Sequence, residues 1–294
     1  MNPKISVIIP TYNREKVVLN TLNCVINQTF EEWECIVVDD FSTDSTYETL
    51  LDYAKRDSRI RIFRNERTKG ACGARNTGLS YAKAELVQFF DSDDEMSPEM
   101  LAELFNSLRD DADVVTCWTN VIDVDTGETI KTFENITKGH IHSSLLSEKT
   151  YVDTNCALIR KNVVERIEGW SEDCPSFQEW DFHLRLSKIA NYSTLRKHLI
   201  RYYVGGSDII SKSLSKWVAG RLYIINKNKK ELLLIHPIAY LKKMLYIYYL
   251  ILKTKDDLEK NKSMKMYIEK TDSLTRLMIK FLNIPYSHIK NERK

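Results

Sequence analysis

The chain has 294 residues, 43% of them hydrophobic and 29% charged, which is typical of a globular protein with one large domain and a smaller appendage. With only 9 Gly and 6 Pro, it is not a low-complexity chain. Its six cysteines form no CxxC pair, which argues against a zinc site or disulfide framework and indicates buried, reduced thiols in a cytosolic protein. The apolar run 5–9 is too short for a signal peptide.

The formal net charge is only +2, but the charge is distributed unevenly along the chain. From Lys212 onward there are 19 Lys and Arg against 7 Asp and Glu, which leaves 24 basic and 34 acidic residues before it. Such an asymmetry indicates two roles. We expect the acidic part to hold cations and the basic part to face an anionic surface.

The first hundred residues alternate between the periods of strands and helices. Apolar runs predict buried strands at 5–9 and 34–38. An alternating pattern predicts a third strand at 59–63, a fourth is expected at 85–90, and the segments between the strands repeat apolar residues at helical spacing. Ser42 or Asp44 is expected to cap the helix after the second strand. Ser97 and Pro98 are expected to open a helix after the fourth strand.

This alternation predicts a mostly parallel sheet with helices on both faces. Ligands of such sheets bind at the carboxyl ends of the strands. Polar segments follow three of the predicted strands, at 11–13, 39–40 and 91–94. A binding site is therefore expected at this edge.

The pattern changes after residue 112. The runs 113–123 and 128–133 flank a Thr126-Gly127 turn and predict a hairpin. A strand is expected at 154–160, a helix at 179–190, and mainly helix beyond about residue 212.

The most apolar stretch, 231–253, is interrupted by Pro237, Lys242 and Lys243, which makes it a poor membrane-spanning helix. Two alternatives fit it equally well. It is either a helix lying at a membrane interface or a helix packed on the catalytic domain with a solvated basic face.

Three carboxylates, Asp91, Asp93 and Asp94, follow the predicted strand 85–90 directly. Carboxylates this close repel one another, and a divalent cation would offset the repulsion. Mg²⁺ prefers oxygen ligands and is usually held by one or two carboxylates together with substrate phosphates. The alternative is a solvated acidic loop that caps the next helix.

Two other segments carry charges suited to a nucleotide. A carboxylate at Asp39 or Asp40 could accept hydrogen bonds from a base or ribose, and Arg75 near a helix start could pair with diphosphate oxygens. The alternatives are helix capping and a surface ion pair. The glycines around Arg75 form neither a GxGxxG motif nor a Walker loop.

A third acidic segment is QEWDFHLRL. Glu179 and Asp181 are two positions apart, so on a helix they point in different directions and at most one is expected to face the cleft. A carboxylate there could act as the base for an attacking hydroxyl, or could only favour the helix N-terminus.

Taken together, ISVIIPTYNRE, the VVDD run, GACGARNTGL, FFDSDD and QEWDFHLRL occur in the order and spacing of family-two inverting glycosyltransferases. The chain resembles this family over roughly residues 4–210. The resemblance implies the GT-A fold, an α/β fold with a mostly parallel, Rossmann-like central sheet flanked by helices. Residues 1–211 would form the catalytic domain, with a nucleotide-sugar half at 1–95 and an acceptor half at 96–211. Residues 212–294 would form a basic helical extension.

The resemblance also implies a role for each matching position of the donor site. Pro10, Thr11 and Tyr12 would lie against the base and ribose. Asp40 would bind the base, commonly uracil in this family, and Arg75 would approach the base or diphosphate.

The DSDD stretch would be the family's DxD motif, with Asp91 and Asp93 in its two acidic places. Asp93, followed by Asp94, would hold Mn²⁺ or Mg²⁺, and Asp91 would contact the donor.

Glu179, six positions before Arg185, would be the catalytic base, a place more often filled by Asp in this family. Asp181 and Trp180 are candidates for the acceptor site.

One position departs from the family. Val204 stands where many relatives carry a His that assists metal or diphosphate binding. His183 and His198 are nearby, and both are expected to be structural.

The implied function is transfer of a sugar, most simply from a UDP-sugar, to a hydroxyl of a glycan or lipid-linked glycan in bacterial polysaccharide synthesis. The implied location is cytoplasmic or peripheral on the inner membrane face. The alternatives are a non-catalytic sugar-nucleotide-binding module and a sugar-phosphate nucleotidyltransferase. The latter normally needs a Gly-rich basic loop where this chain has PTYNRE. No nucleic-acid-binding motif accompanies the basic tail.

Overall fold

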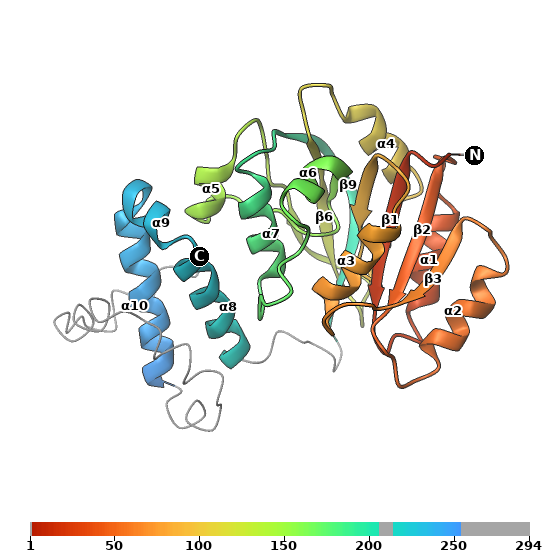
Figure 1. Cartoon of the computed structure of the whole chain (residues 1–294), viewed down its shortest axis with the longest axis horizontal. Coiled ribbons are helices and arrows are strands. Elements are labelled where there is room, and N and C mark those ends of the chain that lie inside the picture. Colours follow the sequence, from red (N-terminus) through yellow and green to blue (C-terminus); the bar gives the residue numbers. More distant parts are fainter. Residues whose placement is uncertain (1, 206–213, 254–294) are drawn as a thin grey trace. The chain divides into compact units, whose positions relative to one another are not determined.

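The computed structural model describes residues 2–205 and 214–253, which fall into two compact units (Figure 1). The described part of the first unit is 2–173 and 178–205. That of the second is 174–177 and 214–253. The expected domain boundary at residue 211 lies outside the described residues.

The first unit is built on one nine-stranded sheet in the order β3-β2-β1-β4-β8-β6-β9-β5, with β7 paired to β6. Its first half is parallel, as predicted, and consists of β1 (Ile5–Thr11), β2 (Trp33–Asp39), β3 (Ile60–Arg64) and β4 (Leu86–Phe89). Every residue of β1, β2 and β4 is buried, which explains why these strands are continuous apolar runs.

Three helices connect these strands: α1 (Val18–Ile26), α2 (Thr46–Ala54) and α3 (Ala71–Tyr81). The chain reverses its direction across the sheet between β3 and β4, so right-handed crossovers put α3 on the face opposite α1 and α2 (Figure 1). Helix α3 packs on β1 and β2. A side chain at Gly78 would overlap Ile8, so this close approach requires glycine.

The second half of the sheet is mixed. β8 (Ala157–Arg160) runs antiparallel to both β4 and β6 (Val114–Asp123), while β9 (Tyr192–Val204) is parallel to β6 and antiparallel to β5 (Glu95–Met96). The hairpin of β6 and β7 (Thr129–Phe133) is confirmed, with Gly127 at a φ of 73° in its turn. The helices of this half are α4 (Met100–Ser107), α5 (His142–Leu146), α6 (Lys161–Arg166) and α7 (Gln178–Leu186).

Two capping predictions differ from the structure. Helix α4 begins at Met100, and its N-cap is Glu99 rather than Ser97, whose hydroxyl is buried without a hydrogen bond in the described part of the chain. The N-cap of α2 is Ser45. The Ser45 side chain makes no capping hydrogen bond, and Asp44 accepts one from the Thr46 amide at 3.0 Å instead. Asp44 thus satisfies one of the free amides of the first turn from outside the cap position.

The described part of the second unit is helical, as predicted, with α8 (Leu214–Lys227), α9 (Lys229–Ile235) and α10 (Pro237–Lys253). Pro237 opens α10, a position where its missing amide costs no hydrogen bond. Across residues 2–205 and 214–253, none of the helices has the length and apolar character that crossing a bilayer requires.

Candidate functional site

The carboxyl ends of β1, β2 and β4 lie at one edge of the sheet, since β1 pairs in parallel with both neighbours. The loops after β1 and β2 are joined there. The Thr43 amide donates to Asn13 Oδ1 at 2.8 Å, and Asn13 Nδ2 donates to Thr43 Oγ1 at 3.2 Å. These bonds fix the backbone next to Thr11 and Asp40, which is the edge where the sequence predicted a binding site.

The two acidic residues after β2 have different environments. Asp39 is fully buried and paired with Arg64 at 2.6 Å. Asp40 is fixed by neutral donors, with Asn65 Nδ2 at 2.6 Å from one oxygen and the Gly70 amide at 2.8 Å from the other. Each Asp40 oxygen keeps a second lone pair, so Asp40 is better suited than Asp39 to accept a hydrogen bond from a nucleotide.

The residues that end β1 offer a polar and an aromatic group. Pro10 and Thr11 are buried, and Thr11 Oγ1 has no hydrogen-bond partner among the described residues. Tyr12 is exposed, with Lys69 Nζ 4.9 Å from its ring centroid. A buried hydroxyl without a partner next to an exposed ring is consistent with a bound base or ribose at this position.

Arg75, on α3, is buried, so the alternative of a surface ion pair is wrong. Its Nη2 lies 2.7 Å from Asp91 Oδ1, and its guanidinium lies 4.5 Å from the ring centroid of Trp170. The Arg75 Nε has no partner in the described ranges. The site therefore contains a fixed cation with an unused donor, which suits the binding of a diphosphate.

The three carboxylates after β4 are not equivalent. Asp94 is buried, and its oxygens accept from Asn155 Nδ2 at 2.6 Å and from the Tyr203 amide at 3.1 Å. Asp93 is exposed and lies 3.2 Å from Arg14 Nη2. Asp91 Oδ1 accepts the 2.7 Å hydrogen bond from Arg75 Nη2.

Desolvation, followed by the charge of Asp91, raises the pKa values of both Asp93 and Asp94 above their usual range. A divalent cation would relieve this repulsion between carboxylates. No three His, Cys, Asp or Glu side chains in the described parts of the chain are arranged to hold a metal by themselves. The residues therefore fit a cation that Asp93 and Asp94 share with substrate phosphates.

Glu179 lies in the first turn of α7 and accepts a hydrogen bond from Tyr151 Oη at 3.2 Å. Burial raises the pKa of Glu179, the charge of Asp91 raises it further, and Arg75 and Tyr151 oppose the increase. A carboxylate whose pKa is raised toward neutrality is a stronger base, as general-base catalysis requires.

The segment that precedes β8 was not predicted to belong to the site. Tyr151 contacts Glu179, Asp153 interacts electrostatically with Asp91 and Glu179, and Asn155 Oδ1 accepts from the Asp91 amide at 2.8 Å. Since β8 is antiparallel to β4, the residues before β8 lie beside those after β4. The strand at 154–160 was predicted, but only its pairing with β4 would have pointed to these side chains.

Asp153 supports a prediction about pH. Burial raises its pKa to about 7 from the usual 3.8, so the folded protein holds a proton that the unfolded chain releases. Between about pH 4 and pH 7 this group therefore lowers stability as the pH rises. Asp153→Asn should raise the melting temperature above that of the native chain. This increase should be larger at about pH 8 than at about pH 4.

The control is Asp125→Asn, which changes an exposed carboxylate of the β6–β7 turn. Its effect on the melting temperature should be the same at both pH values. If the effect of Asp153→Asn were also the same at both, the shifted pKa would be wrong.

The proposed acceptor residues Asp181 and Trp180 are both buried in hydrogen-bonded positions. Asp181 Oδ2 accepts from Arg185 Nε at 2.8 Å and from Ser171 Oγ at 2.6 Å, and Trp180 Nε1 donates to Leu145 O at 3.0 Å. These contacts hold α7 in place and favour a packing role over direct contact with an acceptor.

Both histidines near the site have structural contacts, as expected. His183 is buried, its Nδ1 lies 2.9 Å from Tyr192 Oη, and burial lowers its pKa to about 3. His198 Nε2 lies 3.0 Å from Glu134 on the surface. Val204, in place of the family His, ends β9 in register with Asp123.

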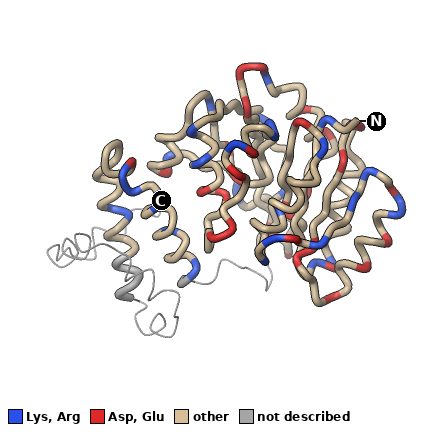
Figure 2. Tube along the Cα trace, in the orientation of Figure 1, with Lys and Arg blue, Asp and Glu red and all other residues tan. Residues whose placement is uncertain are grey.

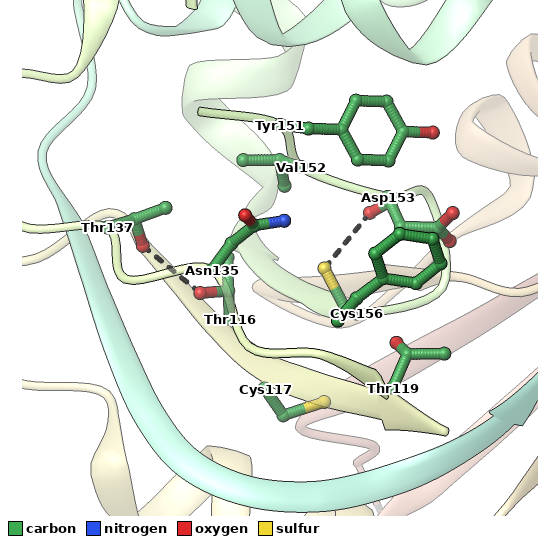
Figure 3. A pocket seen from close by; sticks show the side chains of 10 residues that line it. Thr116, Cys117, Thr119, Asn135, Thr137, Tyr151, Val152, Asp153 and Cys156 are labelled. Atoms are coloured by element: carbon green, nitrogen blue, oxygen red, sulfur yellow. Dashed lines mark hydrogen bonds between the residues drawn. The ribbon is translucent and has the colours of Figure 1, made fainter. Parts of the chain in front are cut away.

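A small pocket, open at one side, lies beside Tyr151, whose hydroxyl donates to Glu179 (Figure 3). Tyr151 and Asp153 form one wall, and Figure 3 shows Thr116, Thr137 and Asn135 opposite them. The pocket has room for a water-sized group, to which its hydroxyl, amide and carboxyl groups could hydrogen-bond.

Comparison with known proteins agrees with this geometry. The model of "Glycosyl transferase family 2" matches residues 6–168. An Escherichia coli protein, UDP-Glc:alpha-D-GlcNAc-diphosphoundecaprenol beta-1,3-glucosyltransferase WfgD, is 44% identical over 90 residues, which are 31% of this chain and 35% of that protein. The chain spans 35% to 48% of the lengths of the first curated relatives that it matches.

Two solved structures share the fold. S. aureus TarS 1-349 in complex with UDP-GlcNAc has a TM-score of 0.62 and 19% identity, and the match covers 94% of this chain and 78% of that one. A mannosyltransferase from Pyrobaculum calidifontis, in complex with GDP-Man and Mn²⁺, has a TM-score of 0.60 and 16% identity, covering 95% and 79%. The family model spans more than half of the 294 residues and includes the polar segments from Pro10 to Asp94. The chain belongs to glycosyl transferase family 2.

Proposed function

We propose that this chain transfers a sugar from a UDP-sugar to a hydroxyl of a lipid-linked glycan, with inversion at the anomeric carbon. The observation that carries the proposal is a group of charges at one sheet edge. Burial raises the pKa of Glu179, and Glu179 also interacts with Arg75 and Asp91, which form a part-buried ion pair at 2.7 Å. A base close to a diphosphate-binding cation is the arrangement that glycosyl transfer from a nucleotide donor needs.

The donor would lie along the ends of β1 and β2. Asp40 would accept a hydrogen bond from the base, Tyr12 would lie against it, and Thr11 Oγ1 would gain the partner that it lacks among the described residues. Arg75 would donate to a diphosphate oxygen. The choice of UDP rests on Asp40 and on the UDP-based donor in the names of WfgD and the TarS complex.

Asp93, with Asp94 behind it, would hold Mn²⁺ or Mg²⁺. A bound cation would supply positive charge against the departing diphosphate. Asp94 is the more constrained of the two because Asn155 and Tyr203 already use one lone pair on each of its oxygens.

Glu179 would take the proton of the acceptor hydroxyl while the hydroxyl oxygen attacks the anomeric carbon. One carbon–oxygen bond forms, the bond to the phosphate oxygen breaks on the opposite face, and UDP leaves with the electron pair. Tyr151 would hold Glu179 in position. Arg75 and Asp91 would position the donor, which can itself lower the barrier by several kcal/mol.

Binding of the donor can be tested on the full chain by thermal shift with UDP-, GDP- and dTDP-sugars, each with and without Mn²⁺. Ligands that bind the native state raise the melting temperature by mass action. We expect a Mn²⁺-dependent increase with UDP-sugars that is lost in Arg75→Met and retained in Arg67→Met, a change of an exposed arginine before α3. If no donor shifted the melting temperature even with Mn²⁺, the proposal of a donor site would be overturned.

A further inference from the structure

The second unit combines strong positive charge with apolar side chains exposed to solvent. Its described helical segment, 214–253, contains eight Lys and Arg and a single acidic residue, Glu231 (Figure 2). Basic segments of this kind are attracted to anionic surfaces.

The exposed apolar side chains gather at the corner between α9 and α10. Leu233, Leu234, Ile235 and Ile238 are exposed to 44%, 84%, 48% and 72%. The opposite sides of the same helices are buried, with Leu232 and Met244 in the interior of the unit. The exposed set is therefore additional to the core, and large apolar side chains that are exposed close together in this way point to an interaction site.

Basic residues flank this corner at helical spacing. Lys230 is exposed one turn before Leu234 on α9, and Lys242 is exposed one turn after Ile238 on α10. Residues four apart lie on the same side of a helix, so each of the two most exposed apolar side chains has a lysine beside it. Apolar side chains with flanking lysines form the pattern of a helix that lies in a membrane interface.

We propose that the α9–α10 corner docks on an anionic lipid bilayer, with Leu233, Leu234, Ile235 and Ile238 inserted between the headgroups and the neighbouring lysines bound to lipid phosphates. An anionic bilayer is the occupant that fits both properties of the surface, because it offers apolar depth and negative charge together. The inference deepens the proposed function, because a lipid-linked acceptor lies in such a membrane.

The test is co-sedimentation of the full chain with phosphatidylcholine vesicles that contain or lack phosphatidylglycerol. The native chain should bind the anionic vesicles. The double variant Leu234→Ser, Ile238→Ser should bind them on the order of tenfold less, since two large apolar side chains no longer insert. Lys230→Glu with Lys242→Glu should weaken binding to the vesicles that contain phosphatidylglycerol and leave binding to the vesicles that lack it unchanged.

The matched control is Ile130→Ser with Ile136→Ser, two exposed apolar residues of the first unit at 58% and 54%. Its binding should equal that of the native chain. All six positions are exposed, so the variants are expected to fold, and circular dichroism checks this. Unchanged binding by the Leu234 and Ile238 variant would overturn the proposal.

A second copy of the chain is the main alternative occupant of the corner. If the Leu234 and Ile238 variant lost an oligomer seen by light scattering but bound vesicles normally, the corner would be a protein interface and the proposal would be wrong. The donor-induced thermal shift of the same variant reports on the catalytic unit. A failure of membrane docking is thereby distinguished from a failure of the proposed function.

Discussion

Glu179→Gln should lower turnover by about 10³-fold while leaving donor binding intact. The amide keeps the size of the side chain and can still accept a hydrogen bond from Tyr151, but it cannot take a proton from the acceptor hydroxyl. The measurement is release of UDP from the donor identified by thermal shift, with an undecaprenol-linked glycan as acceptor. The donor-induced increase in melting temperature should match that of the native chain.

Glu165→Gln is the matched control, because Glu165 is an exposed glutamate of the same unit and is paired with Lys161 at 3.3 Å. It should retain native turnover. Near-native turnover in Glu179→Gln would show that another group is the base. Asp153, which is close enough to interact with Glu179 electrostatically, would then be the next candidate.

The order of elements in the first half of the sheet could be predicted because β1, β2 and β4 are apolar runs and β3 alternates between apolar and charged residues. Strands β1, β2 and β4 are buried on both faces, and their ends carry the polar residues that the sequence analysis selected. The long strand β9 was not among the predicted strands. Its sequence, YSTLRKHLIRYYV, is charged at its centre and partly exposed, so it has no apolar run to mark it.

The identity of the acidic residues could be predicted from their spacing, but their separate environments could not. Asp94 and Asp181 are buried because of bonds from Asn155, Tyr203 and Arg185, and two of these partners are 61 and 109 positions away from Asp94. Spacing along the chain places carboxylates at a sheet edge. Which of them remains open to a ligand depends on tertiary partners, which local patterns do not encode.

Asn155 is the residue that connects the acidic loop to the segment carrying Tyr151, and its removal should have the largest effect on stability. Asn155→Ala deletes the bond to the buried Asp94 carboxyl at 2.6 Å and the bond from the Asp91 amide at 2.8 Å. A hydrogen bond to a charged group contributes about 1.5–3 kcal/mol, and a neutral one contributes about 1 kcal/mol. We expect the free energy of unfolding in urea to fall by about 3 kcal/mol.

The control for size is Asn135→Ala, a half-buried amide of the pocket wall, which should cost well under half as much. A double-mutant cycle with Asp94→Ala then shows how Asn155 acts. If Asn155 acts mainly by satisfying Asp94, its replacement should cost at least about 1 kcal/mol less once Asp94 is absent. Additive costs would contradict this account and leave the Asp91 amide as the main partner. In either background, donor binding should weaken together with stability, because the same side chain holds both the carboxyl-bearing loop and the segment that positions the base.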